Sequence, residues 1–298
     1  MTLAFDHPRG RTSDFAIAVP IRRAGVLAQD ICRRGGVAEV AAVFDRSLYL
    51  RAGEAFICIG EPAIGNGPLT LVVDGSLPRL RLQQGQAASI AEQRITIGDL
   101  LFGLDRCETW RLPAWPVAAL PARLIETSAA IARRAVESPP GSLARAMFGA
   151  DDTPLARIAR PRIAHLLDRK LSRTMTVRAL TTAVTGLLGL GPGLTPAGDD
   201  FLIGALTLLD AIGQERLRAA LGDAIAEVAP ALTSPLSACF LTAAANGHVG
   251  EHLHRMVASV ITEDIDAAVA AAGRIGHTSG WDALTGVAAT LPIVAEKL

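Results

Sequence analysis

The chain has 298 residues, more than most single domains contain, so its length predicts two domains or one large domain. Half of the residues are hydrophobic, 19% are charged and only 4% are aromatic, a composition typical of closely packed helices with small side chains. Lysine plus arginine equals aspartate plus glutamate at 29 each, so no net charge attracts nucleic acid or an anionic membrane. A small-molecule substrate is favoured.

The cysteines and the N-terminus indicate a cellular compartment. Cysteines are widely spaced without a Cys-x-x-Cys pair, which argues against a zinc site and a disulfide framework. They are Cys32, Cys58, Cys107 and Cys239. Residues Met1–Arg11 carry charges and prolines where a signal peptide needs an apolar core, and no apolar run is long enough to span a bilayer. We therefore expect a cytoplasmic protein without a membrane segment.

The first third of the chain alternates short, β-branched apolar runs with turn residues. The predicted strands include Val37–Phe44, Ser47–Arg51, Ala55–Gly60 and Leu69–Val73. We interpret residues 1–115 as a β-rich N-terminal domain, built as an antiparallel sheet or a small barrel. Three prolines within Leu112–Pro121 then predict a linker, because proline interrupts both helices and strands.

Helical periodicity follows the linker and predicts a helical domain over residues 122–298. The predicted helices are Ala122–Val136, Ser142–Gly149, Pro154–Leu171, Thr176–Leu188, Pro196–Ile212, Glu215–Val228, Leu232–Asn246, Glu251–Ile261, Ile265–Arg274 and Ser279–Glu296. The expected fold class is α+β, with an N-terminal β sheet or small barrel followed by a C-terminal α-helical domain.

The segment Gly189–Asp200 has the character of a ligand-binding loop that opens a helix. Three glycines within Gly189–Gly193 permit positive φ and close approach to a ligand, while the enclosed proline stiffens the backbone. Thr195 is placed as the N-cap and Pro196 as the first helical residue. Amide groups of the first turn would then point at whatever lies above the loop. An ordinary, well-formed helix start explains the same pattern.

Two adjacent carboxylates, Asp199 and Asp200, fall in the first turn of this predicted helix, ahead of the apolar run Phe201–Leu209. One of them is expected to face the interior, where a carboxylate needs a partner. A second segment repeats the pattern, since Gly198–Gly204 and Gly280–Gly286 both read Gly-x-Asp-x-Leu-x-Gly. Each copy predicts a glycine loop, an Asp in the first turn and a glycine one turn later.

Gly204 and Gly286 lie four residues after Asp200 and Asp282, on the same helical faces. Two such helices could cross closely at the glycines and place Asp200 and Asp282 side by side. Like charges in that position need a cation or a donor-rich substrate between them. The alternative is that the glycines only permit close packing, while the aspartates cap separate helices.

Other polar residues also suggest functional or structural roles. His277, in the loop before the second motif helix, is a candidate general acid or base, or an anion ligand; a histidine bonded to the loop backbone is the alternative. The hydroxyls of Thr233–Ser237 are interpreted as helix caps. Three histidines are placed on the surface of a helical turn, where their spacing argues against zinc: His248, His252 and His254.

At the two motif segments the sequence resembles a known family. Gly191–Asp200 reads Gly-Pro-Gly-Leu-Thr-Pro-x-x-Asp-Asp, and Gly276–Asp282 reads Gly-His-Thr-Ser-Gly-x-Asp. These motifs resemble those of a domain family, long catalogued as of unknown function, that includes the AllH-type subunit of oxamate carbamoyltransferase. The resemblance covers the C-terminal half; the N-terminal half is similar only in length and strand-rich character. Ala197 and Gly198 replace a different pair in that subunit, which leaves the substrate open.

The resemblance implies a role in allantoin or purine breakdown, where a multi-subunit enzyme converts oxalurate and phosphate to oxamate and carbamoyl phosphate. The implied partners are a small ureido or carboxylate substrate, phosphate and other subunits of the complex. Within the two motifs the candidate catalytic residues are Asp199, Asp200, His277 and Asp282. The candidate substrate-binding residues are Gly191, Gly193, Leu194, Thr195, Thr278, Ser279 and Gly280.

Carbamoyl transfer needs donors for phosphate or carboxylate and acceptors for ureido N–H groups. Loop amides can supply the donors. Asp199, Asp200 and Asp282 can supply the acceptors, or can hold a Mg²⁺ that bridges to phosphate. Because bare carboxylates repel phosphate, we favour the metal-free arrangement in which the anion and the ureido group lie at opposite ends of the site. A non-catalytic binding or scaffold subunit and a Mg²⁺-dependent amidohydrolase stay open as alternatives.

Overall fold

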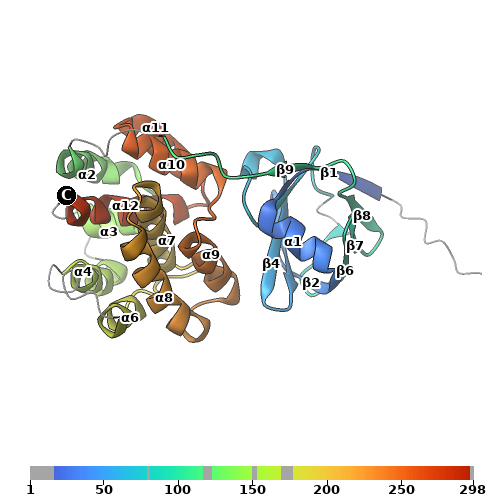
Figure 1. The fold of residues 1–298 in the computed structure, drawn as a ribbon, viewed down its shortest axis with the longest axis horizontal. Helices are drawn as coiled ribbons and strands as arrows, with labels where there is room; N and C mark the ends of the chain where they lie inside the picture. The colour runs from blue at the N-terminus through green and yellow to red at the C-terminus, as the bar shows by residue number, and fades with distance from the viewer. Residues whose placement is uncertain (1–16, 79–80, 117–122, 150–152, 169–176, 296–298) are drawn as a thin grey trace, which may run out of the picture.

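The computed structural model describes residues 17–78, 81–116, 123–149, 153–168 and 177–295. A β-rich N-terminal body and a helical C-terminal body lie side by side, joined by an extended segment between β9 and α2 (Figure 1). The predicted α+β class, with strands first and helices second, is confirmed. The final residues of the predicted linker, the end of the helix predicted to reach Leu171 and the start of the one predicted at Thr176 lie outside the described residues.

The described residues of the N-terminal body form one sheet of nine strands, in the order β5-β4-β3-β2-β6-β7-β8-β1-β9. The strands are β1 (Ile17–Gly25), β2 (Gly36–Val43), β3 (Ser47–Ala52), β4 (Ala55–Gly60), β5 (Thr70–Val73), β6 (Ala87–Ala91), β7 (Arg94–Ile97), β8 (Leu100–Gly103) and β9 (Glu108–Trp110). A further pairing of β5 with β1 closes the first eight into a barrel. All four predicted strands are confirmed.

Of the two predicted forms, an antiparallel sheet or a small barrel, the small barrel is confirmed, and its strand pairing is mixed rather than purely antiparallel. β1 runs parallel to both β8 and β9, and β4 runs parallel to β5. A helix that strand alternation did not reveal, α1 (Val26–Arg34), carries the chain from β1 to β2, and a short 3₁₀ turn, Pro62–Ile64, lies between β4 and β5. Connections of this kind, unlike tight hairpins, allow neighbouring strands to run in the same direction.

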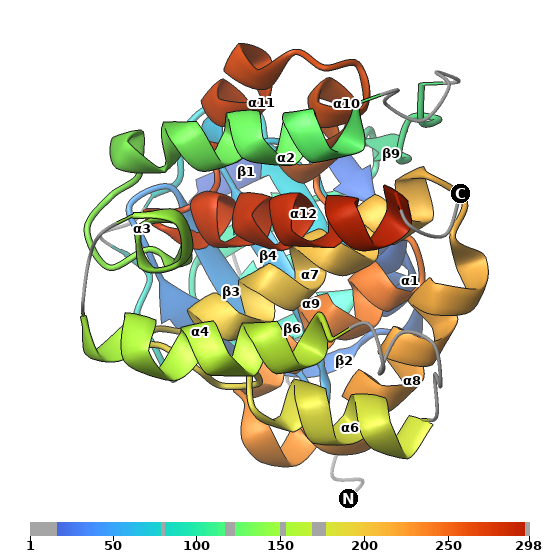
Figure 2. The same cartoon turned by 90° about the vertical axis from the view of Figure 1, so that its left-hand side faces the viewer.

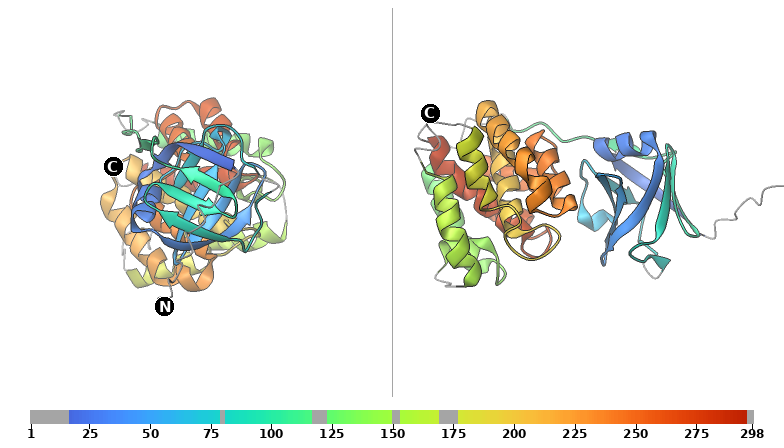
Figure 3. Two further views of the ribbon diagram at one scale, coloured as in Figure 1. Left: turned by 90° about the vertical axis from the view of Figure 1, so that its right-hand side faces the viewer. Right: turned by 90° about the horizontal axis from the view of Figure 1, so that it is seen from below.

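Strand alternation decides which side chains face the helical body. On β3, Leu48 and Leu50 are fully buried in the barrel core, so Tyr49 and Arg51 between and after them point outward. Tyr49 packs edge-on against Phe240 of the helical body, with ring centroids 6.2 Å apart. Figure 3 shows the barrel beside the helical body. The Tyr49–Phe240 contact makes the outer face of β3 part of the contact between them.

The helices follow the predicted periodicity closely. They are α2 (Leu124–Arg133), the 3₁₀ turn η3 (Arg134–Glu137), α3 (Leu143–Phe148), α4 (Pro154–Leu166), α6 (Val177–Thr185), α7 (Ala197–Ala211), α8 (Glu215–Leu232), α9 (Pro235–Ala245), α10 (Glu251–Ile261), α11 (Ile265–Ala272) and α12 (Ser279–Ala295). None of the helices in the described ranges is both long and apolar enough to cross a bilayer.

Helices α7 and α12 form the centre of the helical body, and both are buried along most of their length (Figure 2). A Cβ atom at Gly204 would overlap the carbonyl oxygen of Ala283, and one at Gly286 would overlap the carbonyl oxygen of Phe201. The two backbones are thus in direct contact at the two glycines. The predicted close crossing of the two motif helices is confirmed.

Two further contacts fasten the barrel and the linker to the helical body. Asn66 donates from its backbone and side chain to the Glu251 carboxylate, at 3.1 and 2.6 Å. Trp115 in the linker donates to Asp210 at 2.9 Å and stacks on His254 with centroids 4.3 Å apart. Trp115 therefore fixes the linker against the helical body, although the linker has neither helix nor strand there. We call residues 111–116 the linker strap.

Candidate active site between two helix starts

The glycine loop before α7 has the backbone that its sequence predicts. Gly189, Gly191 and Gly193 all have positive φ, at 71°, 111° and 100°. A Cβ at Gly189 would collide with the carbonyl oxygen of Leu232, so the loop is also closely packed at its first glycine. Leu194 at the loop tip is 42% exposed and accepts a 2.6 Å hydrogen bond from the Ser234 hydroxyl through its carbonyl.

The predicted helix start is wrong by one residue. Pro196, with an extended ψ of 147°, is the N-cap, and α7 begins at Ala197. The Thr195 hydroxyl does not cap the helix; it lies 3.2 Å from the Ser279 hydroxyl at the start of α12. The shift matters because it brings a hydroxyl from each motif together above the two helix starts.

Asp199 is fully engaged by the protein. Its Oδ1 accepts from the Gly189 amide at 2.8 Å, and its Oδ2 accepts from the Thr233 hydroxyl and, at 2.6 Å, from the Ser237 hydroxyl. The Thr233–Ser237 segment was expected to cap a helix, and Ser234 does cap α9 by accepting from the Ser237 amide at 3.0 Å. The Thr233 and Ser237 hydroxyls instead donate to Asp199 and so connect the start of α9 to the glycine loop.

Asp200 and Asp282 are also buried, with 6% and 0% exposure, but each has one oxygen without a partner in the described structure. Asp282 accepts from the Leu143 amide at 2.6 Å through Oδ1, and its Oδ2 is unpartnered. The Oδ2 atom of Asp200 is unpartnered too. A buried carboxyl oxygen without a donor is costly, so these two atoms mark a candidate site.

Burial shifts the titration of both groups. Desolvation raises the pKa of Asp282 to about 7, although the Leu143 amide and the Thr278 hydroxyl oppose the shift. Desolvation also raises the pKa of Asp200 well above its ordinary range; hydrogen bonds from Ser279 and Thr195 lower it, and the charge of Asp282 raises it further. The effect of the Asp282 charge on Asp200 supports the predicted pairing of the two residues, which stays a prediction. Burial therefore favours the protonated form of both carboxyls.

The remaining candidates lie around this pair. Thr278 and Ser279 are half-buried at the start of α12, and Gly280 packs against the carbonyl oxygen of Ala272, where a Cβ would not fit. His277 is exposed in the preceding turn. The two motifs therefore meet as predicted, with His277 at the outer edge rather than beside the carboxyl pair.

The site does not suit the Mg²⁺ ion that three aspartates could hold. In the described ranges no group of three or more His, Cys, Asp or Glu side chains is arranged to bind a metal ion. Asp199 is engaged by three protein donors, which leaves only two of the three carboxyls for a ligand.

The prediction that the α10 histidines lie on the surface is wrong. His252 and His254 are half-buried, because α10 packs against the barrel and the linker strap rather than solvent. Burial lowers the pKa of both imidazoles. The four cysteines are present as thiols, in agreement with the predicted absence of a disulfide framework.

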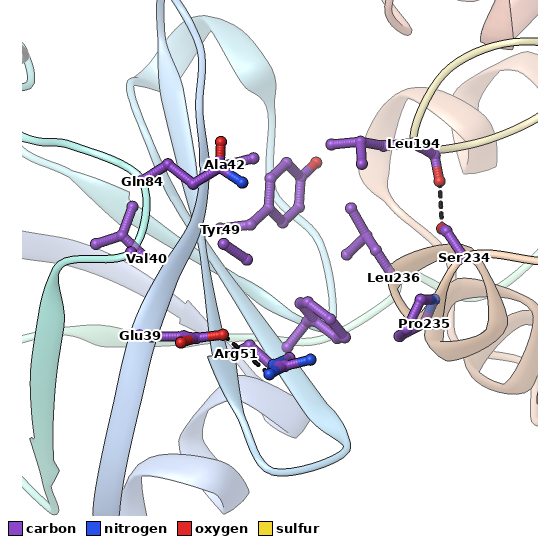
Figure 4. Close-up of a pocket in the computed structure, with 13 residues that line it drawn as sticks. Glu39, Val40, Ala42, Tyr49, Arg51, Gln84, Leu194, Ser234, Pro235 and Leu236 are labelled. Atoms are coloured by element: carbon purple, nitrogen blue, oxygen red, sulfur yellow. Dashed lines mark hydrogen bonds and ion pairs between the residues drawn. The ribbon is translucent and has the colours of Figure 1, made fainter.

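A pocket of about 270 Å³ lies between the outer face of the barrel and the helical body (Figure 4). Strands β2 to β4 supply one wall, and Leu194 with the start of α9 supplies the other. Its lining residues are Glu39, Val40, Ala41, Ala42, Tyr49, Arg51, Phe56, Gln84, Gly85, Leu194, Ser234, Pro235 and Leu236.

This pocket was missed at the sequence level. Tyr49 is the chain's only tyrosine, and the alternation Leu48-Tyr49-Leu50-Arg51 could have shown a polar outer face on β3. The charge of Asp200 also contributes to a raised Tyr49 pKa, after the larger effects of Cys58 and burial.

The chain thus folds as a mixed β-barrel joined to a helical body, with a buried carboxyl pair where two glycine-rich motifs meet. Residues 18–109 match the model of the AllH family N-terminal domain, and residues 187–291 match that of the oxamate carbamoyltransferase subunit AllH. The chain belongs to the AllH family. No curated protein and no solved structure matches it.

Proposed function

We propose that the chain is a carbamoyl-transferring subunit, and that Asp200 and Asp282 bind the ureido or carbamoyl group of its substrate. The observation that carries the proposal is the pair of buried Oδ2 atoms without partners at the meeting point of the two motifs. Family membership supports a role within a multi-subunit enzyme. The reaction would be oxalurate plus phosphate to oxamate plus carbamoyl phosphate, in allantoin or related ureido catabolism, and the free thiols suit a cytoplasmic setting.

A carboxyl pair that shares a proton matches the hydrogen-bonding groups of a ureido unit. The protonated member donates to the ureido carbonyl, and the ionised member accepts from an N–H. The Thr195 and Ser279 hydroxyls, 3.2 Å apart, can act as either donor or acceptor beside them. The same pair would repel a phosphate dianion, so we place phosphate on the side of the loop amides rather than against the carboxyls.

The bond changes assign a proton to the pair. A phosphate oxygen attacks the carbamoyl carbon, the bond from that carbon to the oxamate nitrogen breaks, and the nitrogen takes up a proton. The proton that phosphate releases and the one that nitrogen gains balance. A carboxyl with a pKa of about 7, as Asp282 has, can donate that proton and recover it near neutral pH.

Asp199 has a different part in this proposal. Its three protein donors connect the glycine loop to α9, so we propose that it holds the loop in place rather than reacting. His277 at the exposed edge would exchange protons with solvent or contact the phosphate.

The test is phosphate-dependent carbamoyl transfer by the full chain, alone and with its co-expressed subunits. Oxalurate and inorganic phosphate are supplied, and the formation of oxamate and carbamoyl phosphate is measured with and without phosphate. We expect turnover that Asp200→Asn and Asp282→Asn each abolish while the thermal unfolding temperature is kept. Normal turnover in either variant would remove that residue from the proposal.

A second candidate is a ligand-binding or scaffold subunit without its own chemistry. It is favoured by the lack of a cationic side chain among the described contacts of Asp200 and Asp282, since phosphate would need one. Oxamate binding without turnover, even with the other subunits and phosphate present, would support it. A hydrolase is separated from both because its activity would not need phosphate.

A further inference from the structure

We propose that the pocket between the barrel and the helical body binds the carboxylate end of the substrate, and that Arg51 on β3 recognises it. The inference rests on the proposed function, because it takes the ligand to be a small carboxylate that also carries an amide or ureido group. It adds a residue from the barrel to a site that both motifs place on the helical body.

Among the described residues that line the pocket, Arg51 is the only one with a cationic side chain. It follows Tyr49 on the outward face of β3, and its cross-strand neighbour on that face is Phe56. Figure 4 shows the guanidinium and the Tyr49 ring at different parts of the same pocket. An arginine on a rigid strand offers a planar set of donors that suits a carboxylate.

The Arg51 guanidinium is positioned by an ion pair that leaves some of its N–H donors available. Its Nη2 atom forms an ion pair with Oε1 of Glu39 at 3.0 Å, and the two side chains are 49% and 48% exposed. Arginine carries five N–H donors, so this contact leaves others for a ligand. Glu39 orients Arg51 and at the same time competes with an incoming anion.

The lining favours a monoanion over a dianion. One guanidinium beside one carboxylate leaves little net positive charge for phosphate, and much of the remaining wall is apolar, including Leu194, Leu236 and Phe56. Burying a second negative charge there without a partner would be costly. A carboxylate that brings one charge and a short carbon chain fits this balance.

The pocket reaches the glycine loop that precedes α7. Leu194 lines the pocket, and the next residue, Thr195, contacts Ser279 beside Asp200. Tyr49 extends from the barrel wall and lies within electrostatic reach of Asp200. A ligand with its carboxylate at Arg51 and its nitrogen end toward Asp200 would keep its negative charge away from the acidic pair.

The experiment measures binding of oxamate and, separately, inorganic phosphate to the full chain by titration calorimetry. Arg51→Ala should weaken oxamate binding about 10- to 100-fold, as expected for losing hydrogen bonds to a charged group. Arg51→Lys should recover part of the affinity. Glu39→Gln should tighten oxamate binding, because it removes the competing carboxylate. Arg94→Ala, an exposed arginine on β7, is the matched control and should bind as wild type does.

Arg51→Ala should weaken oxamate binding and Glu39→Gln should tighten it. These opposite changes in affinity distinguish recognition of the carboxylate by Arg51 from an ion pair that is merely structural. Equal weakening by both, or wild-type affinity in Arg51→Ala, would overturn the inference. Phosphate binding that depends on Arg51 more than oxamate binding does would overturn the carboxylate assignment. Asp282→Asn distinguishes the two proposals. If Asp282→Asn loses oxamate binding and Arg51→Ala keeps it, the proposed function stands and the pocket assignment fails. If Arg51→Ala loses oxamate binding and Asp282→Asn keeps it, only the pocket assignment stands. Absence of oxamate binding to wild type would contradict both.

Discussion

Asp199 and Asp200 are neighbours in the sequence but lie in opposite environments. Asp199 receives three protein donors, whereas Asp200, like Asp282 on the other motif, keeps a buried oxygen without a partner. Adjacent residues on a helix point about 100° apart, so one faces the start of α9 and the other faces α12. The comparison shows that one of the two adjacent acids holds the loop in place, and we propose that the other contacts the ligand.

The largest effect should come from removing the acid function at the unpartnered positions. Asp200→Asn and Asp282→Asn should each lower turnover by about 10²- to 10⁴-fold, the range for a lost general acid or a misplaced substrate. Stability should be kept or raised, because a neutral amide replaces a buried acid. Steady-state rates and thermal melts check this. An unfolded Asp282→Asn protein would mean that this carboxyl is structural, as Asp199 is.

The second prediction concerns pH and stability. Because the folded protein raises the pKa of Asp282 to about 7, the folded state binds more protons than the unfolded state between about pH 4 and 7. The unfolding free energy should therefore fall as pH rises through this window, by up to about 4 kcal/mol, and level off above it. Asp200 should extend the fall. Urea unfolding at several pH values measures the slope.

Asp282→Asn is the control for that slope. The variant cannot ionise at this position, so most of the decline between about pH 4 and 7 should disappear. A wild-type stability that rises over the same window, or a slope unchanged by the substitution, would show that the carboxyl is not held in its protonated form.

A third prediction tests the other half of the comparison. Asp199→Ala should lower the unfolding free energy by about 3 kcal/mol, because it leaves the Gly189 amide and two hydroxyls without their acceptor. Asp223→Ala, at an exposed position on α8, is the matched control and should change stability by less than about 0.5 kcal/mol. Full stability with lost oxamate binding would instead make Asp199 a ligand contact.

The smallest effect is expected at His277. It is exposed in the turn before α12, and Asp282 is better placed to carry a proton, so His277→Ala should change turnover by about twofold. A loss of about 10²-fold would move the acid–base role to this histidine.

Much of the helical domain could be predicted from the sequence because periodicity, proline and glycine all act locally. Glu251–Ile261 was predicted to the residue, and the crossing at Gly204 and Gly286 followed from their spacing after the aspartates. The start of α7 was off by one because the choice between Thr195 and Pro196 as cap depends on Ser279, which is far away in sequence.

The barrel could be predicted only in part. Alternation located β3 and its neighbours, but the parallel pairing of β1 with β8 depends on how the chain returns after eighty residues or so, which no local pattern encodes. The position of Arg51 in a pocket could not be predicted for the same reason, because the opposite wall is formed by Leu194 and the start of α9, which are distant in sequence. The donor to Asp282, the backbone amide of Leu143, carries no side-chain signal at all.

The central claim is that a ligand lies where the two motifs meet, and a crystal structure with oxamate or carbamoyl phosphate bound tests it most directly. We predict the ligand between residues 191–200 and 276–282, with an N–H or carbonyl group within hydrogen-bonding distance of the Oδ2 atoms of Asp200 and Asp282. A saturating ligand bound elsewhere, with both oxygens left to each other or to water, would contradict the account.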